Sequence, residues 1–573
     1  MSAKNLVHTV LPTHYEDQHI RVVMKPAGID VGGASPAEPL DPSAVSLSGP
    51  HRPPGLVEIL AELDPGRSPF RPINRLSRFE AGILVLGKSE DVAEQLRREW
   101  KAGHVHQDYL AIVLGKPGAR LTIGGPDAPS RDKRRAAVPA VRAARSPTRE
   151  RLGSAHTTVQ LIEHSERRSL VRCRTNAPNT HVLRAQLRSA RLRLVGDSLH
   201  DSTHRPADPA ATFLHLAGVS LKVPGVARPI SLRADPDSDP RGYLGREPDL
   251  ARFLRAALVR RLPLLSATST NCFRLITGPA EGLGGVVAEV FGRVLVLQIH
   301  HRRAADRRWL EQIARWYRDV LDIKTVYVKS FVKQEDRTAG RHRPELHPDK
   351  PLFGPPIDGE IVAVENGVRF SIRPGSGLSV GLFLDQRDNR RKVRERSAGK
   401  DVLNLFAYTC GFSVAAAVGG AKHTSSVDIS PKHLDWGRRN FELNGIDPTD
   451  HLFFKSDAAD FLDRAQRQGR SFDLIIIDAP SFAHGRSKRE TFSIATDLPA
   501  LIEQATELLR PRGTLLVSTN YRKMTADQLR RAVRQGTGKR RLVLEAPPLP
   551  RDFAMDPDHA KSLWVTLSGA EDS

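Results

Sequence analysis

Three acidic residues in the last third of the chain each stand at the end of an apolar run. Asp428 closes Ser-Ser-Val-Asp, Asp457 follows Phe-Phe-Lys-Ser, and Asp478 closes Phe-Asp-Leu-Ile-Ile-Ile-Asp. Open parallel sheets bind their ligands at the carboxyl ends of the strands, so carboxylates at these positions can meet a ligand. We expect Asp428 to accept hydrogen bonds from both hydroxyls of a ribose, and Asp457 to accept one from an adenine amino group.

The segment before Asp428 predicts the rest of a nucleoside site. Residues 402–406 form an apolar run suited to a buried parallel strand, Gly411 lets the backbone pass close to a ligand, and residues 412–418 suit a helix packed on the sheet. The Gly-x-Gly-x-x-Gly pattern that holds a pyrophosphate is missing. We therefore expect a single adenosine with a bulky tail, such as S-adenosylmethionine, although an ordinary strand–turn–helix unit would show the same local pattern.

The loop after Asp478 reads Ala-Pro-Ser-Phe and could hold a nucleobase. The carboxylate of Asp478 and the backbone carbonyl of Pro480 can accept hydrogen bonds from an amino-bearing base edge. Phe482 offers a ring on which an extruded base can stack. We predict that Asp478, Pro480 and Phe482 form the catalytic site.

Taken in order, these motifs resemble the class I S-adenosylmethionine-dependent methyltransferases of large-subunit ribosomal RNA, which include cytosine-C5 and guanine-N7 enzymes. The matching segments are residues 381–390, 404–413, 426–428 and 478–482, and the similarity continues upstream to residues 273–298. Two positions depart from the pattern, because Cys410 stands where the family usually has Gly and Ala479 where it usually has Pro. Neither change removes a carboxylate.

The resemblance implies a Rossmann-like methyltransferase domain that binds S-adenosylmethionine, with no metal. The cofactor-binding residues come from the Phe-Leu-Asp-Gln-Arg motif, from the turn after the first strand and from the ends of the following strands. The predicted cofactor-binding residues are Phe383, Gln386, Arg387, Asn404, Phe406, Thr409, Gly411, Asp428, Ile429, Asp457, Ala458 and Asp478.

The cysteines help to predict which base receives the methyl group. Carbon 5 of cytosine is not nucleophilic, so an enzyme that methylates it must first add a cysteine thiolate to carbon 6. The cytosine-C5 relatives carry that cysteine after the strand that here covers residues 513–518, where Thr519, Asn520 and Tyr521 follow. We expect Cys410 to face the methionine part of the cofactor and not the base. Guanine N7 already has an exposed lone pair and needs mainly orientation, so we favour a purine nitrogen over the cytosine-C5 alternative.

Residues 1–225 resemble the RluA-type pseudouridine synthases. The matching segments are residues 20–28, 74–86, 108–111 and 195–197. The position of that family's catalytic Asp holds Ser77, whose hydroxyl is not ionised at neutral pH. The motif also departs at Asn74 and at Glu80-Ala81, whereas Tyr109 and Arg184 match the family's other pocket residues. We read this region as an RNA-binding platform without isomerase chemistry.

Two other classes of function stay open. The chain could be a bifunctional enzyme with an active synthase region, provided that another carboxylate replaces the one missing at Ser77. It could also be a noncatalytic ribosome-assembly factor that uses the cofactor only as structure. The intact Asp428 and Asp478 argue against the second alternative.

The charge of the chain favours a ribosomal RNA partner. Its 87 Lys and Arg against 65 Asp and Glu give a net charge of +22, and such an excess attracts a polyphosphate. Two segments concentrate this charge, although some of the second must be the solvated face of a helix. The first comprises Arg131, Lys133, Arg134, Arg135, Arg142, Arg145, Arg149 and Arg151, and the second Arg387, Arg390, Arg391, Lys392, Arg394 and Arg396.

The length of 573 residues predicts several domains of mixed α/β and α+β type. We expect a pseudouridine synthase-like domain over 1–225, a linker and helix over 226–262, a small central α/β domain over 263–372, and the methyltransferase domain over 373–573. The central domain should contain a helix over 305–321 and close with a hairpin turning at Asn366-Gly367. Three scattered cysteines, no signal-like N-terminus and no long apolar run predict a cytoplasmic protein without a metal cluster or a membrane span.

Overall fold

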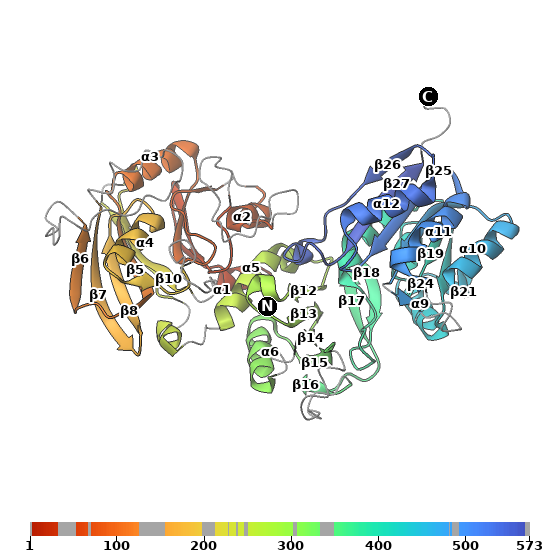
Figure 1. Cartoon of the computed structure of the whole chain (residues 1–573), viewed down its shortest axis with the longest axis horizontal. Helices are drawn as coiled ribbons and strands as arrows, with labels where there is room; N and C mark the ends of the chain where they lie inside the picture. Colours follow the sequence, from red (N-terminus) through yellow and green to blue (C-terminus); the bar gives the residue numbers. More distant parts are fainter. Residues whose placement is uncertain are drawn as a thin grey trace. The chain divides into compact units, whose positions relative to one another are not determined.

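The computed structural model describes residues 3–32, 53–66, 70–124, 155–197, 212–226, 228–236, 239–245, 250–301, 306–332, 349–480, 482–483 and 492–567. The chain divides into two compact units, one made of Met1–Leu47 and Pro54–Ser266 and the other of Ser48–Pro53 and Ala267–Ser573. Figure 1 follows the chain by colour, from the red N-terminus to the blue C-terminus.

The first unit is built on a mixed sheet with the strand order β1-β2-β4-β10-β5-β8-β7-β6, to which β3, β9 and β11 are added by pairing with β4, β5 and β10. The strands are β1 Thr13–Glu16, β2 Ile20–Lys25, β3 Arg71–Pro72, β4 Ala81–Gly87, β5 His106–Leu114, β6 Arg120–Gly124, β7 His156–Ser165, β8 Arg168–Thr175, β9 Arg193–Leu194, β10 Leu214–Leu221 and β11 Ile230–Arg233. The helices are α1 Ala3–Val10, α2 Leu56–Leu63, α3 Glu90–Lys101, α4 Thr180–Ser189 and α5 Leu250–Ser266.

The expectation of a linker and helix over 226–262 holds for the helix, which is α5, and needs a correction for the linker. Residues 230–233 form β11, which pairs antiparallel with β10 of the first unit. Helix α5 also belongs to this unit, packs against α1 and α2, and buries Leu254, Ala257 and Leu258. The Asp, Pro and Gly residues of this segment occur both in linkers and between short elements, so composition alone could not separate the two.

The second unit begins with a sheet in the order β12-β13-β14-β15-β16, followed by the hairpin β17–β18. Its elements are β12 Cys272–Ile276, β13 Val286–Phe291, β14 Val294–Ile299, α6 Arg307–Leu321, β15 Thr325–Ser330, β16 Pro351–Phe353, β17 Ile361–Glu365 and β18 Val368–Ile372. The predicted helix is confirmed as α6, whose first turn is capped by Asp306 through the Trp309 amide at 3.1 Å. The predicted hairpin is also confirmed, with φ of 49° at Asn366 and 81° at Gly367, as a type I′ turn requires.

The rest of the second unit forms a doubly wound sheet in the order β21-β20-β19-β22-β25-β27-β26, parallel from β21 to β25 and antiparallel at β27 and β26. Its strands are β19 Asp401–Leu405, β20 His423–Asp428, β21 Leu452–Lys455, β22 Phe472–Asp478, β25 Leu509–Thr519, β26 Leu542–Glu545 and β27 Lys561–Leu567, with a separate small pair β23 Phe482–Ala483 and β24 Phe492–Ser493. Its helices are α7 Arg387–Arg396, α8 Gly411–Val418, α9 Pro431–Leu443, α10 Ala458–Arg467, α11 Ile494–Glu507 and α12 Ala526–Thr537, with 3-10 turns at η7 Leu384–Gln386 and η9 Arg551–Phe553.

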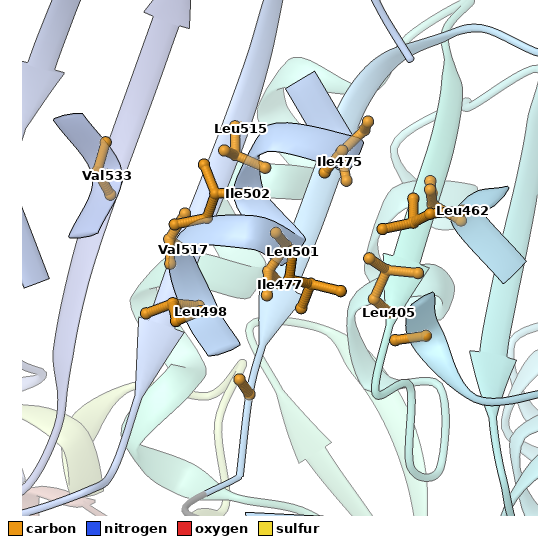
Figure 2. Packing of buried hydrophobic residues seen from close by; sticks show 14 of the residues in the cluster. Leu405, Leu462, Ile475, Ile477, Leu498, Leu501, Ile502, Leu515, Val517 and Val533 are labelled. Carbon is orange, nitrogen blue, oxygen red and sulfur yellow. The ribbon is translucent and has the colours of Figure 1, made fainter. Parts of the chain in front are cut away.

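Alternation along the strands divides this sheet into two buried faces. Figure 2 shows Ile475 and Ile477 of β22 beside Leu515 and Val517 of β25, packed against helix α11. The intervening Ile476 packs on the other face with residues of α7 and α8. Helices therefore cover both faces, and the carboxyl ends of the parallel strands are the edge where a ligand can bind.

The central sheet and the methyltransferase-like sheet share one hydrophobic core. Cys272 and Phe291 of the central sheet pack in one buried cluster with Phe370 of the hairpin, Val414 of α8 and Phe553 of η9. This common core explains why residues 267–573 behave as one compact unit.

Candidate active site

The predicted carboxylates meet at one edge of the parallel sheet. Asp428 ends β20 and Asp478 ends β22, on either side of β19, while Asp457 lies just beyond β21. Neighbouring strands are about 4.8 Å apart, so Asp428 and Asp478 stand about 10 Å apart across the sheet. The chain leaves β19 first toward β20 and later returns to β22, which makes this edge the topological switch point where such sheets bind ligands.

The turn after β19 is strained and firmly held. Phe406, Tyr408 and Cys410 have positive φ values of 56°, 49° and 59°, a conformation that costs non-glycine residues on the order of 1–3 kcal/mol each. The Tyr408 amide donates to Asp428 Oδ2 at 2.8 Å, and the Thr409 hydroxyl donates to the Gly381 carbonyl at 2.6 Å. The left-handed backbone at Cys410 is one that Gly adopts freely, in line with the Gly that the family resemblance implies at this position. Helix α8 then begins at Gly411, so its first backbone amides lie at this turn.

Asp428 holds this turn as well as lying at the ligand edge. Its Oδ1 accepts the Ser430 amide at 2.8 Å, its Oδ2 accepts the Tyr408 amide, and its side chain is 12% exposed. Each carboxylate oxygen can accept more than one hydrogen bond. Asp428 therefore keeps the capacity to bind ribose hydroxyls, in addition to a structural role that the sequence did not reveal.

Asp457 leaves one oxygen available. Its Oδ1 caps α10 by accepting the Ala459 amide at 2.9 Å, whereas Oδ2 forms no hydrogen bond with any residue that the structure describes. Ala458 is buried beside it. Two apolar side chains remain exposed at the same edge: Ile429, directly after Asp428, and Phe383, whose ring contacts Tyr408 with 5.3 Å between centroids.

Asp478 is the centre of a small polar network. Its Oδ1 accepts hydrogen bonds from the Ser518 hydroxyl at 2.6 Å and from the Gln386 amide at 3.2 Å. Gln386 also donates to Ser518 and accepts from Asn389. Burial raises the pKa of Asp478 to about 6. Among the described residues no hydrogen bond reaches Oδ2, so this oxygen can accept one from a ligand.

Three predicted cofactor-binding residues make hydrogen bonds or ion pairs within the protein. The Arg387 guanidinium is buried and forms a two-point ion pair with Asp552, at 2.7 and 2.8 Å, so its charge is compensated inside the protein. The Asn404 amide points into the core and donates to Ser413 at 3.0 Å. Thr409 fixes the turn through Gly381. All three belong to the matching motifs, which record structural requirements as well as ligand contacts.

The basic cluster on α7 is not an open RNA-binding surface. Arg390 is buried against Glu365, at 2.7 and 2.8 Å, as Arg387 is against Asp552. Lys392 and Arg396 pair with Glu545. Arg391 pairs with Asp388 and Glu395, and Arg394 donates to the Asn366 carbonyl. The spacing predicted a basic helix, but only the folded chain shows that acidic partners lie against most of its length.

The loop after β22 is described in part. Pro480 is half-buried, and Phe482 belongs to β23, which pairs with β24. The side chain of Phe482 lies outside the described residues, so its stacking role stays a prediction. The basic insertion from Arg131 to Arg151 lies outside them as well.

The three cysteines of the chain are all buried and free. Burial raises the pKa of Cys173 and of Cys410 to about 12 and moves that of Cys272 still higher. A side chain at Gly437 of α9 would overlap the Cys410 sulfur, so this thiol is packed against a helix. None of these groups is placed or ionised to act as a nucleophile.

Sequence reasoning missed Asp385, the residue next to Gln386, whose side chain faces the other way. Asp385 is buried, and its carboxylate lies 3.7 Å from His559 Nε2. Its negative charge also contributes to the raised pKa of Asp478. The adjacency of Asp385 and Gln386 in the chain was the available signal, but His559 lies far along the sequence and shows no pattern that points to it.

In the first unit, a buried charge cluster surrounds Ser77. The Lys25 ammonium donates to the carbonyls of Ser77 at 2.9 Å and Glu80 at 2.6 Å, and burial lowers its pKa to about 7. Glu80 accepts the Ser77 amide at 2.7 Å and lies 3.6 Å from Arg184. Arg184 in turn pairs with Asp197.

Tyr109, the other residue that matches the synthase pocket, is also buried. Its hydroxyl donates to Gln107 at 2.9 Å, and burial raises the pKa of this hydroxyl. The structure therefore brings Tyr109, Arg184 and a glutamate near Ser77, but the glutamate is 1% exposed.

The doubly wound sheet with carboxylates at the ends of β20, β21 and β22 defines the class of S-adenosylmethionine-dependent methyltransferases. Residues 333–563 match the family model described as S-adenosylmethionine-dependent methyltransferase, and residues 19–189 match the one described as RNA pseudouridylate synthase. Both resemblances predicted from the sequence are thereby confirmed. The fold class predicted for these regions is confirmed as well.

Named relatives place the chain more closely. It is 38% identical to the ribosomal RNA large subunit methyltransferase K of Neisseria meningitidis over 245 residues, 42% of this chain and 67% of the relative. It is 33% identical over 313 residues to YwbD of Bacillus subtilis, also named as a ribosomal RNA large subunit methyltransferase, across 53% of this chain and 75% of the relative. This chain belongs to the family of S-adenosylmethionine-dependent ribosomal RNA large subunit methyltransferases.

A solved structure supports the cofactor. SMU.776, whose structure is described as a methyltransferase complexed with SAH, is 28% identical with a TM-score of 0.50, over 61% of this chain and 88% of that chain. The chain is accordingly an S-adenosylmethionine-dependent enzyme. Among the described residues, no helix combines the length and the apolar character needed to cross a membrane.

Proposed function

We propose that this chain methylates a purine nitrogen in large-subunit ribosomal RNA, with guanine N7 as the favoured atom. The observation that carries this proposal is the state of the cysteines, all of which are buried with raised pKa values. Methylation of cytosine C5 requires a thiolate near the base, whereas the lone pair of guanine N7 requires only orientation.

Asp428 and Asp457 bind different parts of S-adenosylmethionine. S-adenosylmethionine supplies the methyl group from its positively charged sulfur. Asp428 holds the ribose, and the available Oδ2 of Asp457 accepts the adenine amino group. Phe383 and Ile429, exposed at the same edge, cover the apolar faces of the adenosine.

Asp478 orients the base and balances its charge. Gln386 and Ser518 fix Oδ1, so Oδ2 has a defined direction and can accept a hydrogen bond from the base edge, with Pro480 offering its carbonyl beside it. Transfer to guanine N7 places a positive charge on the ring, and a nearby carboxylate stabilises that charge. Asp385 adds a second negative charge close by. No proton has to be removed, so this site can act without a general base.

The base is tested on ribosomal RNA from a strain that lacks the gene. N7-methylguanosine is cleaved after borohydride and aniline treatment, whereas C5-methylcytosine resists conversion by bisulfite. We expect RNA treated with the enzyme to give the aniline cleavage, and the Cys410→Ala variant to give it as well. A product seen only after bisulfite, and lost in Cys410→Ala, would overturn the purine assignment.

The first unit is proposed to bind RNA without isomerising uridine. Ser77 has no carboxylate, and the nearby Glu80 is buried, with its carboxylate on the Ser77 amide and facing Arg184. A carbodiimide assay on undermodified ribosomal RNA tests this reading. Pseudouridine formation by the wild-type chain would contradict it and support the bifunctional alternative.

A further inference from the structure

The central sheet carries an exposed aromatic pair at the ends of two neighbouring strands. His300 follows β14 and Phe331 follows β15, and their rings stack with 5.1 Å between centroids and 10° between planes. The Phe331 amide donates to the Ile299 carbonyl and the His300 amide to the Gly285 carbonyl, each at 2.8 Å. Both rings are exposed, Phe331 by 38%, although the backbone beneath them is fixed.

This pair, which we call the aromatic ledge, lies beside a group of charged residues. Partial desolvation of its ring lowers the pKa of His300, and the neighbouring Arg274, Arg522 and His559 lower it further, against the opposing effect of Asp556. These four residues come from β12, from the loop after β25 and from the segment before β27. The end of the central sheet that carries the ledge therefore faces loops of the methyltransferase sheet.

The charged residues beside the ledge are linked to the candidate catalytic edge by contacts within the second unit. Arg274 lies 3.4 Å from His559, and His559 lies 3.7 Å from Asp385. Asp385 precedes Gln386, which donates to Asp478. Arg522 is 59% exposed and pairs with Asp556 at 3.0 Å. It follows β25, the strand that carries Ser518 near its end. These contacts run through the interior, since Arg274, Asp385 and Gln386 are buried, so the ledge and the catalytic carboxylate belong to one packed region of the second unit.

We infer that the aromatic ledge of Phe331 and His300 stacks an unpaired base of the RNA that carries the target nucleotide. Exposed, rigid aromatic rings next to cationic side chains are the arrangement by which proteins hold single-stranded RNA. The lowered pKa of His300 favours its neutral form, which suits stacking. This role rests on the proposed function, because we take RNA to be the substrate held at Asp478.

The test measures RNA binding apart from methyl transfer. A short fluorescein-labelled single-stranded RNA of mixed sequence is titrated with the full chain, and with the Phe331→Ala, Phe331→Tyr and His300→Gln variants. One stacked base is worth about 1–3 kcal/mol, so we expect Phe331→Ala to weaken binding about 5- to 150-fold. Phe331→Tyr keeps the ring and should bind like the wild type. His300→Gln should weaken binding less than Phe331→Ala does.

Three controls separate stacking from other causes. Val543→Ala removes a more exposed apolar side chain of the same unit, at 63%, and should leave RNA affinity unchanged. Calorimetry should give the same affinity for S-adenosylmethionine in Phe331→Ala as in the wild type. The slope of log affinity against log salt should stay the same in Phe331→Ala, whereas Arg522→Gln should flatten it by about 0.7, because only the second change removes a charge.

If Phe331→Ala bound RNA with wild-type affinity, the stacking role of the aromatic ledge would be overturned. The same would follow if Val543→Ala lost as much RNA affinity as Phe331→Ala. Because the probe measures binding alone, a failure to find N7-methylguanosine would overturn the proposed base and leave this measurement standing. With ribosomal RNA as substrate, Phe331→Ala should raise KM and leave kcat unchanged.

Discussion

Each unit holds a carboxylate near its candidate site, but the two carboxylates differ in what they contact. Asp478 of the second unit is held through Oδ1 by Ser518 and Gln386, and its other oxygen accepts no hydrogen bond from a described residue. Glu80 of the first unit is 1% exposed, with one oxygen on the Ser77 amide and the other facing Arg184. A carboxylate in a pocket is therefore not enough for chemistry. One oxygen must be held and the other must remain accessible.

The largest effect should come from breaking the buried ion pair that supports the second unit. Arg387→Ala leaves Asp552 as an uncompensated buried charge, which typically costs about 3–5 kcal/mol of stability. Denaturant unfolding should show this loss in the second unit and leave the transition of the first unchanged. A variant of normal stability that binds S-adenosylmethionine weakly would return Arg387 to the cofactor site.

The carboxylate of Asp478 should matter more for transfer than for binding. Removing one preorganised electrostatic group typically lowers kcat by about 100- to 1000-fold, so Asp478→Asn should slow methylation by that order with cofactor affinity retained. Ser77→Ala in the first unit is the matched control and should leave methylation unchanged. Equal effects of the two variants would remove the contrast between the units.

Replacing Asp428 should weaken the binding of S-adenosylmethionine. Its replacement by Ala removes charged hydrogen bonds, each worth on the order of 1.5–3 kcal/mol, and calorimetry should detect the weaker affinity for S-adenosylmethionine. Asp428→Asn, which keeps part of the hold on the Tyr408 turn, should weaken it less. Unchanged affinity in both variants would confine Asp428 to its structural role.

Glu80 tests the first unit directly. Glu80→Gln removes the charge that faces Arg184 and should cost the first unit about 1–3 kcal/mol, seen as a lower unfolding midpoint, without altering methylation. The contrast between the units would collapse if the wild type formed pseudouridine and this variant did not. Glu80 would then be the carboxylate that replaces the one missing at Ser77.

The smallest effect should be a pH dependence of methyl transfer. Because the pKa of Asp478 is raised to about 6, its charged form is complete above pH 7 and half lost at pH 6, so kcat should fall about twofold between pH 8 and pH 6 and about tenfold per unit below pH 5. Asp385→Asn removes a like charge and should move this profile to lower pH. A flat profile would remove Asp478 from the rate-determining step.

Much of the candidate site could be predicted because its residues are set by local pattern. Asp428 and Asp478 end apolar runs, and strand ends in a parallel sheet are ligand positions wherever the strands come from. The role of Arg387 could not be predicted in this way, since its partner Asp552 lies 165 residues away. On α7 the sequence shows a row of basic residues with Asp388 and Glu395 among them. It gives no sign of the distant Glu365, Glu545 and Asp552 that meet the others.

The fold shows the same limit. The hairpin at Asn366-Gly367 was predictable because these two residues alone favour a type I′ turn. Strand β11 was not, because a four-residue edge strand is recognised only by its pairing with β10. The separate role of Asp385, next to Gln386 but turned toward His559, likewise depends on a distant residue.

Because Cys410 packs against Gly437, the residue allowed at one of these positions depends on the residue at the other. The sulfur occupies the space that a side chain at position 437 would need, and Cys410 itself adopts a backbone conformation that glycine adopts freely. A chain with Gly at position 410 would have room for Ala at position 437, whereas a chain with Cys at position 410 needs Gly at position 437. The order of substitutions is thereby constrained, and the two positions should vary as a pair across the family.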